Sequence, residues 1–166
     1  MKKIILLISI IVFSVALAEK VEKIELKNLD GDWEGVGEFL VPVTNMNVDI
    51  SGSANFAYNE KSKKLRTSLF GEKLFFTYSD SGYLWVDPKS DTISWEVWDN
   101  RGKHALYHGK LDGNTITGER KRKDEIYRVI IEQVTTDSID FKLNVTQPDG
   151  GSFNKAVFHL WRVKEN

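Results

Sequence analysis

Apolar and polar residues alternate along most of this chain, and a period of two is the pattern of β-strands that bury one face. The alternation is clearest from Ile139 to Val145, where every second residue is apolar. The same pattern occurs at 48–58, 74–78 and 93–97. Each such strand must cover its apolar face, so we expect an all-β protein.

Short polar segments separate the alternating runs, and several contain the Asp-Gly or Asn-containing pairs that tolerate the positive φ of tight hairpins. These segments lie at 79–82, 87–90, 99–102, 112–114 and 149–151. Counting the runs gives about ten strands, preceded by a stretch at Glu19–Leu29 that could form a short helix. So many successive hairpins predict an up-and-down antiparallel β-barrel, because closure removes the exposed sheet edges.

The first eighteen residues have the pattern of a secretory signal peptide. Lys2 and Lys3 form a positive start, residues 4–15 are almost all apolar, and Ala16-Leu17-Ala18 supplies small residues for cleavage. The apolar stretch is shorter than the roughly 20 residues that span a bilayer. We therefore expect residues 1–18 to be removed and residues 19–166 to form one periplasmic or secreted domain with no stable membrane insertion.

The composition excludes several kinds of chemistry. The chain has no cysteine, so disulfides, thiol nucleophiles and cysteine-bound metals are excluded. A net charge of −1 gives no broad attraction to nucleic acid. The sequence also lacks a phosphate-binding glycine-rich loop, a Gly-x-Ser-x-Gly elbow and a His-Glu-x-x-His zinc motif. These absences favour a protein that is not an enzyme and holds no metal.

The first and last strands resemble those of a known superfamily. Gly31 and Trp33 form a Gly-x-Trp motif, and Arg162 lies near the C-terminus. Together with 82–88 and 109–118, these residues resemble the calycins (lipocalins, fatty-acid-binding proteins and nitrobindins), and above all uncharacterised exported bacterial lipocalin-like domains. The resemblance implies a barrel whose narrow end is closed by Trp33 beneath Arg162, a cation–π contact.

Aromatic residues recur at positions expected to face inward. They are Phe56, Phe76, Trp95, Tyr127 and Phe141. A barrel of about ten strands is wide enough to keep a pocket, and aromatic walls suit an apolar or flat molecule. We therefore expect these residues to line a site that holds a small hydrophobic ligand by burial, without turnover. The alternative is that the rings fill the barrel, which then contacts or inhibits a protein partner in the cell envelope.

Two further functions remain open. His159-Leu160 resembles the haem-binding His-Leu pair of nitrobindins, which makes His159 a candidate haem ligand. A barrel-lined isomerase would use Glu96 or His108 as its acid or base. The alternation around Glu96 nevertheless predicts that this carboxylate faces solvent.

The remaining charged residues are expected to lie on the outside. His104 and His108 would be about 13 Å apart along a strand, too far to share one metal ion. Arg128 alternates with apolar wall positions and should face outward. The basic run Arg120-Lys121-Arg122-Lys123 has acidic neighbours on both sides, which is typical of a charged hairpin tip.

Overall fold

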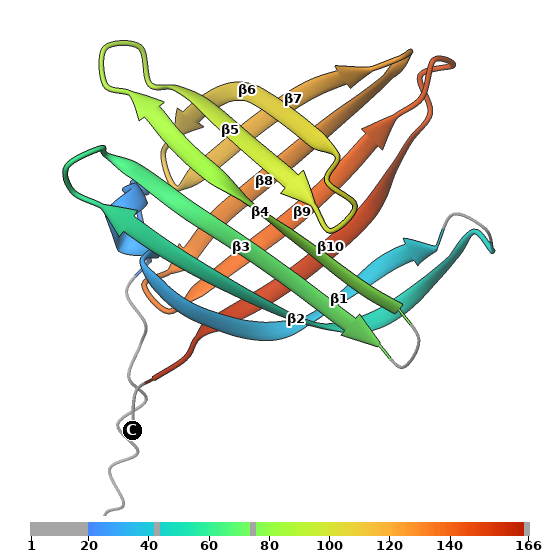
Figure 1. Cartoon of the computed structure of the whole chain (residues 1–166), viewed down its shortest axis with the longest axis horizontal. Helices are drawn as coiled ribbons and strands as arrows, with labels where there is room; N and C mark the ends of the chain where they lie inside the picture. The colour runs from blue at the N-terminus through green and yellow to red at the C-terminus, as the bar shows by residue number, and fades with distance from the viewer. Residues whose placement is uncertain (1–19, 42–43, 74–75, 165–166) are drawn as a thin grey trace, which may run out of the picture.

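The computed structural model describes residues 20–41, 44–73 and 76–164. Ten antiparallel strands form one closed barrel (Figure 1), which confirms the all-β architecture expected from the alternation. The strands are β1 (Gly31–Val41), β2 (Met46–Asn59), β3 (Lys64–Lys73), β4 (Phe76–Asp87), β5 (Thr92–Asp99), β6 (His104–Asp112), β7 (Thr115–Arg122), β8 (Glu125–Thr135), β9 (Ser138–Thr146) and β10 (Ser152–Arg162). Each strand pairs with its neighbour in sequence, and β1 pairs with β10 to close the barrel.

The expected signal peptide, residues 1–18, lies outside the described residues. In the described part of the chain, no helix has both the length and the apolar character needed to cross a membrane.

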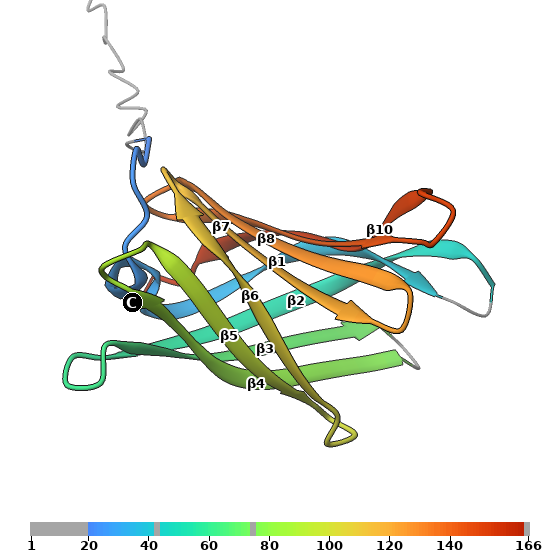
Figure 2. The ribbon, with the colours of Figure 1, turned by 90° about the horizontal axis from the view of Figure 1, so that it is seen from above.

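The segment before β1 contains one 3-10 turn, η1 (Leu26–Leu29), in place of the short helix expected over 19–29. Its apolar side chains do not form one face of a helix. Ile24, Leu26 and Leu29 are buried against the end of the barrel, and the Ile24 N–H donates to the Gly113 carbonyl oxygen at 2.9 Å. Figures 1 and 2 show η1 at the end of the barrel where β10 finishes. The segment from Ile24 to Leu29 therefore plugs this end of the barrel.

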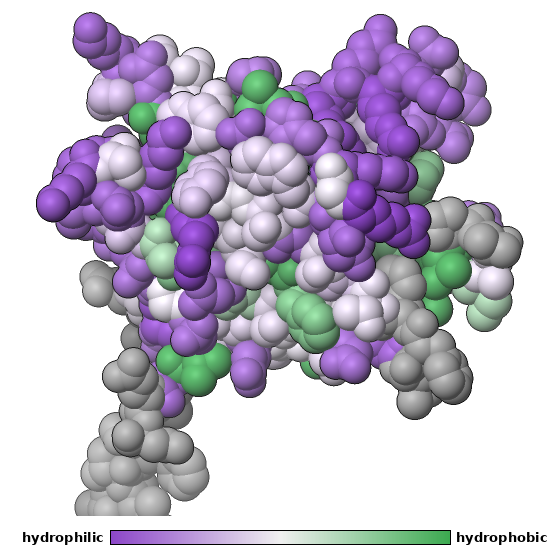
Figure 3. Space-filling view, in the orientation of Figure 1, coloured by the Kyte–Doolittle hydropathy of each residue, from purple (hydrophilic) through white to green (hydrophobic). Residues whose placement is uncertain are grey.

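Side chains pack most tightly at this plugged end. The largest fully buried apolar residues at this end are Trp33, Ile24, Leu29, Leu65, Leu84, Ile93, Ile116, Ile131 and Ile139, whereas the buried Val145 lies near the other end of β9. Leu65, Ile93 and Ile116 each stand at the second position of their strand, close to the hairpins at the plugged end. Outward positions on the opposite side of each strand are mostly polar, and the face seen in Figure 3 shows apolar side chains only in small separate groups. Most of the fully buried apolar side chains therefore lie at the plugged end, and the core continues from there to the cavity wall.

β4 runs without a break through 79–82, where the sequence pattern predicted a turn. Gly82 explains the difference, because a Cβ built there would lie 1.9 Å from the carbonyl oxygen of Glu96 on β5. The glycine allows the two strands to approach closely and does not reverse the chain. As a result Asp80, which pairs with Leu69 on β3 and Asp99 on β5, stands inside the sheet instead of at a hairpin tip.

Candidate functional site

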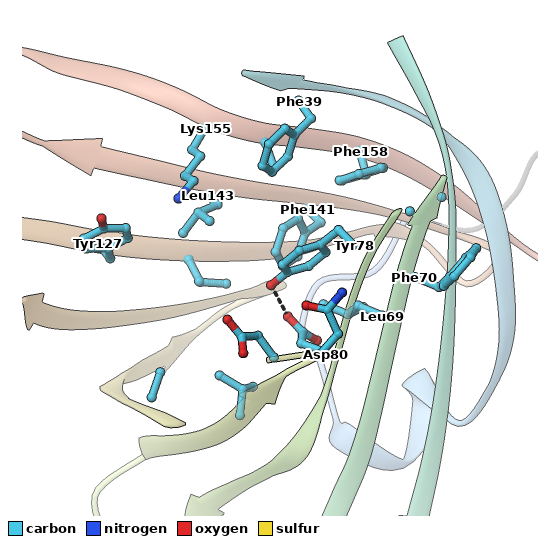
Figure 4. Close-up of a pocket in the computed structure, with 18 of the residues that line it drawn as sticks. Phe39, Leu69, Phe70, Tyr78, Asp80, Tyr127, Phe141, Leu143, Lys155 and Phe158 are labelled. Carbon is cyan, nitrogen blue, oxygen red and sulfur yellow. Dashed lines mark hydrogen bonds between the residues drawn. The ribbon is translucent and has the colours of Figure 1, made fainter. Parts of the chain in front are cut away.

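A cavity of about 580 Å³ occupies the half of the barrel away from the plug. It reaches the turn between β5 and β6, and its volume is typical of sites for small molecules. The apolar and aromatic part of its lining consists of Phe39, Leu69, Phe70, Tyr78, Trp95, Val97, Ala105, Tyr107, Tyr127, Val129, Phe141, Leu143, Ala156, Phe158 and Leu160. Figure 4 shows Phe39, Phe141 and Phe158 gathered around this space. The interior is therefore not filled by packed rings, in contrast to the packed barrel considered from the sequence.

Three of the aromatic residues expected to line the interior do so: Trp95, Tyr127 and Phe141. Trp95 is 2% exposed, and its Nε1 donates to Oγ1 of Thr67 at 3.1 Å. Its ring centroid lies 5.9 Å from that of Tyr107 and 6.4 Å, edge-on, from that of Phe141. These contacts fix Trp95 as one rigid wall of the cavity.

The other two expected lining residues fare differently. Phe56 points inward, but it is 3% exposed in the packed core and does not line the cavity. Its position explains this, since it pairs with Gly31 at the plugged end of β1. The side chain of Phe76 lies outside the described residues. Phe39 and Phe158 line the cavity instead, and both share the inward alternation of their strands.

Trp33 and Arg162 pair across the β1–β10 seam at the plugged end. The guanidinium carbon of Arg162 lies 4.3 Å from the centroid of the Trp33 ring. Trp33 Nε1 donates to the Leu29 carbonyl oxygen at 2.9 Å, and Arg162 donates to the carbonyl oxygens of Asn28 and Asp30. The pair therefore ties η1 to the barrel. Neither residue lines the cavity, so their role is structural.

His159 faces away from the cavity, whereas its strand neighbours Phe158 and Leu160 line it. The alternation of β10 places the imidazole on the outer surface, where Nδ1 forms a short hydrogen bond with Asp140. The ring also packs edge-on against Trp161, with centroids 4.5 Å apart. His159 is therefore not positioned to bind a haem inside this cavity.

Glu96 and His108, considered as an acid or base within the barrel, also do not line the cavity. The Glu96 carboxylate forms a hydrogen bond with Nε2 of His104 at 2.9 Å, and both side chains are partly exposed. Arg128 faces outward as expected and pairs with Glu119 at 2.5 Å. Within the described ranges, no cluster of three or more histidine or acidic residues could hold a metal ion.

Arg120 is the main residue that the sequence pattern misplaced. β7 continues through Arg122, so the hairpin tip begins later than the basic run predicted. Counting alternately from the buried Ile116 places Arg120 inside the barrel. Its guanidinium carbon lies 4.8 Å from the ring centroid of Tyr127 and 5.1 Å from that of Tyr107. Its Nε is buried and has no hydrogen-bond partner.

Lys155 brings a second cation to the same wall. β10 has a bulge at this point, because Asn154 pairs with Asn144 and Ala156 pairs with Leu143, which leaves Lys155 as the extra residue. A bulge redirects the side chain of its extra residue. Lys155 accordingly lines the cavity, with Nζ 5.6 Å from the ring centroid of Tyr127.

The protein balances the positive charge on this wall only in part, because Glu125 opposes the effect of Arg120 and Arg122 on Lys155. Among the described residues, Arg120, Arg122 and Lys155 form no ion pair with a carboxylate. Burial, followed by the charges of Arg120 and Arg122, lowers the pKa of Lys155. Cations held partly out of water without a counter-ion are unfavourable, and a bound anion would supply that counter-ion.

Two hydrogen-bonded side chains, those of Tyr78 and Asp80, project into the cavity from β4. Tyr78 Oη donates to Oδ2 of Asp80 at 2.6 Å, and Figure 4 shows this bond, with Lys155 and Tyr127 on the other side of the cavity. Oδ1 of Asp80 is buried without a hydrogen-bond partner. Burial raises the pKa of Asp80 to about 6, against the opposing effect of the Tyr78 hydrogen bond, and the nearby charge of Asp99 raises it further.

No family model and no curated protein sequence is similar to the chain. The fold of the chain is similar to those of several solved structures. Rv2717c from M. tuberculosis has a TM-score of 0.62 at 16% identity, with 84% of this chain and 95% of that protein covered. A DUF3598-family protein of unknown function from Nostoc punctiforme has a TM-score of 0.62 at 9% identity, covering 87% of this chain and 51% of that one. The S-type phycobiliprotein lyase CpeS from Guillardia theta has a TM-score of 0.59 at 11% identity, with 85% and 92% covered. The chain spans about half the length of the Nostoc protein, and it shares a barrel fold with all three.

Proposed function

We propose that the barrel binds one small molecule with an apolar body and an acidic group, and holds it by burial without chemical turnover. The observation that carries this proposal is the side chain of Arg120, which lies inside an aromatic cavity with its Nε unpartnered. A structural arginine would be expected to have a carboxylate partner, as Arg128 has in Glu119.

The apolar part of the ligand would lie deeper than its acidic group. Trp95, Phe141 and Leu160 form the inner wall, whereas Arg122 stands at the end of β7 near the cavity mouth. Burial of about 200 Å² of apolar surface gives roughly 5 kcal/mol. One charge-assisted hydrogen bond adds about 1.5–3 kcal/mol. Together these gains are close to the roughly 8 kcal/mol of a micromolar complex.

Two further observations support the proposal, one on the binding role and one on where the ligand is met. A barrel of this fold also occurs in a protein named as a phycobiliprotein lyase, so the architecture is not limited to packed, ligand-free domains. The signal-peptide pattern of residues 1–18 supports export, which would make the periplasm or the cell exterior the place where the ligand is met.

The test is calorimetric titration at pH 7.5 with decanoate and with methyl decanoate, which has the same chain but no charge. We expect one molecule of decanoate per barrel and at least tenfold weaker binding of the ester, because only the carboxylate meets Arg120. Arg120→Met should weaken decanoate binding about tenfold or more and leave the ester unaffected.

Lys121→Met is the matched control, because Lys121 is the next residue of β7 and is exposed on the outer face. Its affinity for decanoate should equal that of the wild type. The proposal fails if decanoate gives no saturable binding, or if the two methionine variants bind decanoate equally.

A further inference from the structure

The cavity contains an acceptor as well as cations. Asp80 lines the cavity from β4, and the side chain is largely buried. One carboxylate oxygen accepts the Tyr78 hydroxyl, and the other is buried with no partner among the described residues. A buried carboxylate oxygen without a donor is costly, since such atoms in folded proteins nearly always have one.

No side chain of the described residues fills this role. Asp99, which pairs with Asp80 across the β4–β5 ladder, is itself an acid and can only repel it when both are ionised. Asp99 already accepts the backbone N–H groups of Arg101 and Lys103, at 2.9 and 2.8 Å. The free oxygen of Asp80 is therefore an acceptor that the protein leaves unused.

The cations of the opposite wall do not satisfy Asp80 either. Among the described residues, Asp80 forms no ion pair with Arg120, Arg122 or Lys155. Arg120 acts on the Tyr107 hydroxyl both by its charge and by a hydrogen bond, whereas Asp80 acts on it by charge alone. The cavity thus has a cationic position at Arg120 and Lys155 and a separate acceptor at Asp80. Its lining also includes other polar side chains, among them Thr77, Asp99, Asn100, Arg101, Lys103 and His104.

We propose that the molecule bound in this barrel is a hydroxylated acid, whose acidic group meets Arg120 and Lys155 and whose hydroxyl donates to the free oxygen of Asp80. This inference rests on the proposed function, because it assigns a second contact of the same ligand. A hydroxyl fits better than an amine, because a cationic group would be repelled by the cations that line the cavity. An unsubstituted fatty acid would leave the Asp80 oxygen unpaired and would bind less tightly.

The experiment compares decanoate with the series of monohydroxydecanoates, in which the hydroxyl moves along the chain from carbon 2 to carbon 10. Affinities are measured by calorimetry at pH 7.5, where Asp80 is ionised. At least one isomer should bind the wild type about tenfold or more tightly than decanoate, because a hydrogen bond to a carboxylate is worth that factor. Isomers with the hydroxyl elsewhere should bind more weakly than decanoate.

Asp80→Leu should remove the preference for that isomer and leave the affinity for decanoate within about threefold of the wild type. Asp80→Asn, which keeps the shape of the side chain, covers the case in which the leucine variant does not fold, and it should reduce the preference several-fold. Glu96→Gln is the matched control, because this acid lies on the outer face and should leave the preference unchanged.

The outcomes separate the two proposals. If no acid of the series binds, the proposed function is wrong. If decanoate binds but no hydroxylated isomer binds more tightly, the assignment of Asp80 is wrong and the proposed function stands. If the preferred isomer keeps its advantage in both Asp80 variants, the hydroxyl has another acceptor and the assignment is again wrong.

Discussion

Arg120 lies over the ring of Tyr127 inside the barrel, with 4.8 Å between the guanidinium carbon and the ring centroid. Lys155 approaches the same ring to 5.6 Å. Two cations therefore share one aromatic side chain in a partly dry cavity, where their mutual repulsion is weakly screened. A bound anion would relieve this repulsion.

The affinity for decanoate should fall at alkaline pH because of Lys155. Burial and the neighbouring charges of Arg120 and Arg122 lower its pKa in the free protein, whereas a bound carboxylate would raise it again. Affinity should therefore be constant near neutral pH and decline as Lys155 loses its proton, at a pH below the value of about 10.4 for an ordinary lysine. Calorimetry from pH 7 to 10 measures this, and Lys155→Met should flatten the profile. An unchanged profile in that variant would exclude Lys155 as the titrating group.

The contribution of Asp80 to the stability of the ligand-free protein should be more favourable at acidic than at neutral pH. Its pKa is about 6 when folded, above the ordinary value near 4, so the folded state binds a proton more tightly. This contribution is fully present below pH 4 and is lost as the pH rises to 6. The free energy of unfolding of Asp80→Asn, taken relative to that of the wild type, should therefore increase by on the order of 2 kcal/mol from pH 3.5 to pH 7.5. Urea unfolding at both pH values gives the difference, and a gap that does not change with pH would contradict the expectation.

Removing the guanidinium of Arg162 should weaken the whole barrel. Arg162→Met loses the cation–π contact with Trp33 and leaves the carbonyl oxygens of Asn28 and Asp30 without their donor. We expect the free energy of unfolding to fall by about 2–4 kcal/mol. Arg66→Met is the control, since Arg66 is exposed on β3, and it should cost less than about 0.5 kcal/mol. Equal losses in the two variants, measured by urea unfolding, would show that Arg162 has no special role.

The shape of the cavity should depend on Gly52. A Cβ at this position would lie 2.6 Å from the ring of Phe158, which lines the cavity. Gly52→Ala should therefore push the Phe158 ring into the ligand space and weaken decanoate binding several-fold, at a cost in stability of about 1–3 kcal/mol. Ser51→Ala is the control, because Ser51 is the preceding residue of β2, is exposed and does not line the cavity, and this variant should bind decanoate as the wild type does. Unaltered binding by the Gly52 variant would mean that the ligand does not reach Phe158.

The architecture could be predicted from the sequence because alternation and hairpins leave few alternatives for a chain of this kind. The positions of Trp95, Tyr127 and Phe141 followed from the same alternation. The contact of Trp33 with Arg162 was expected from the calycin resemblance and not from spacing, since the two residues are far apart in sequence.

The polar residues of the cavity were harder to place, and for physical reasons. Arg120 stands in a basic run with acidic neighbours, which is also the composition of a solvated turn. Asp80 belongs to the segment Ser79-Asp80-Ser81-Gly82, which has the composition of a turn. In the structure Gly82 instead allows β4 and β5 to approach closely. Lys155 faces inward because of a bulge, and a bulge shifts the alternation by one residue at a position that the sequence does not mark.

The most direct test is a crystal structure of the protein with 10-bromodecanoate, in which anomalous scattering locates the bromine. We predict one molecule inside the barrel, with its carboxylate within hydrogen-bonding distance of Arg120 and its bromine among Trp95, Phe141 and Leu160. A bromine on the outer surface, or a carboxylate that does not contact Arg120, would contradict the account.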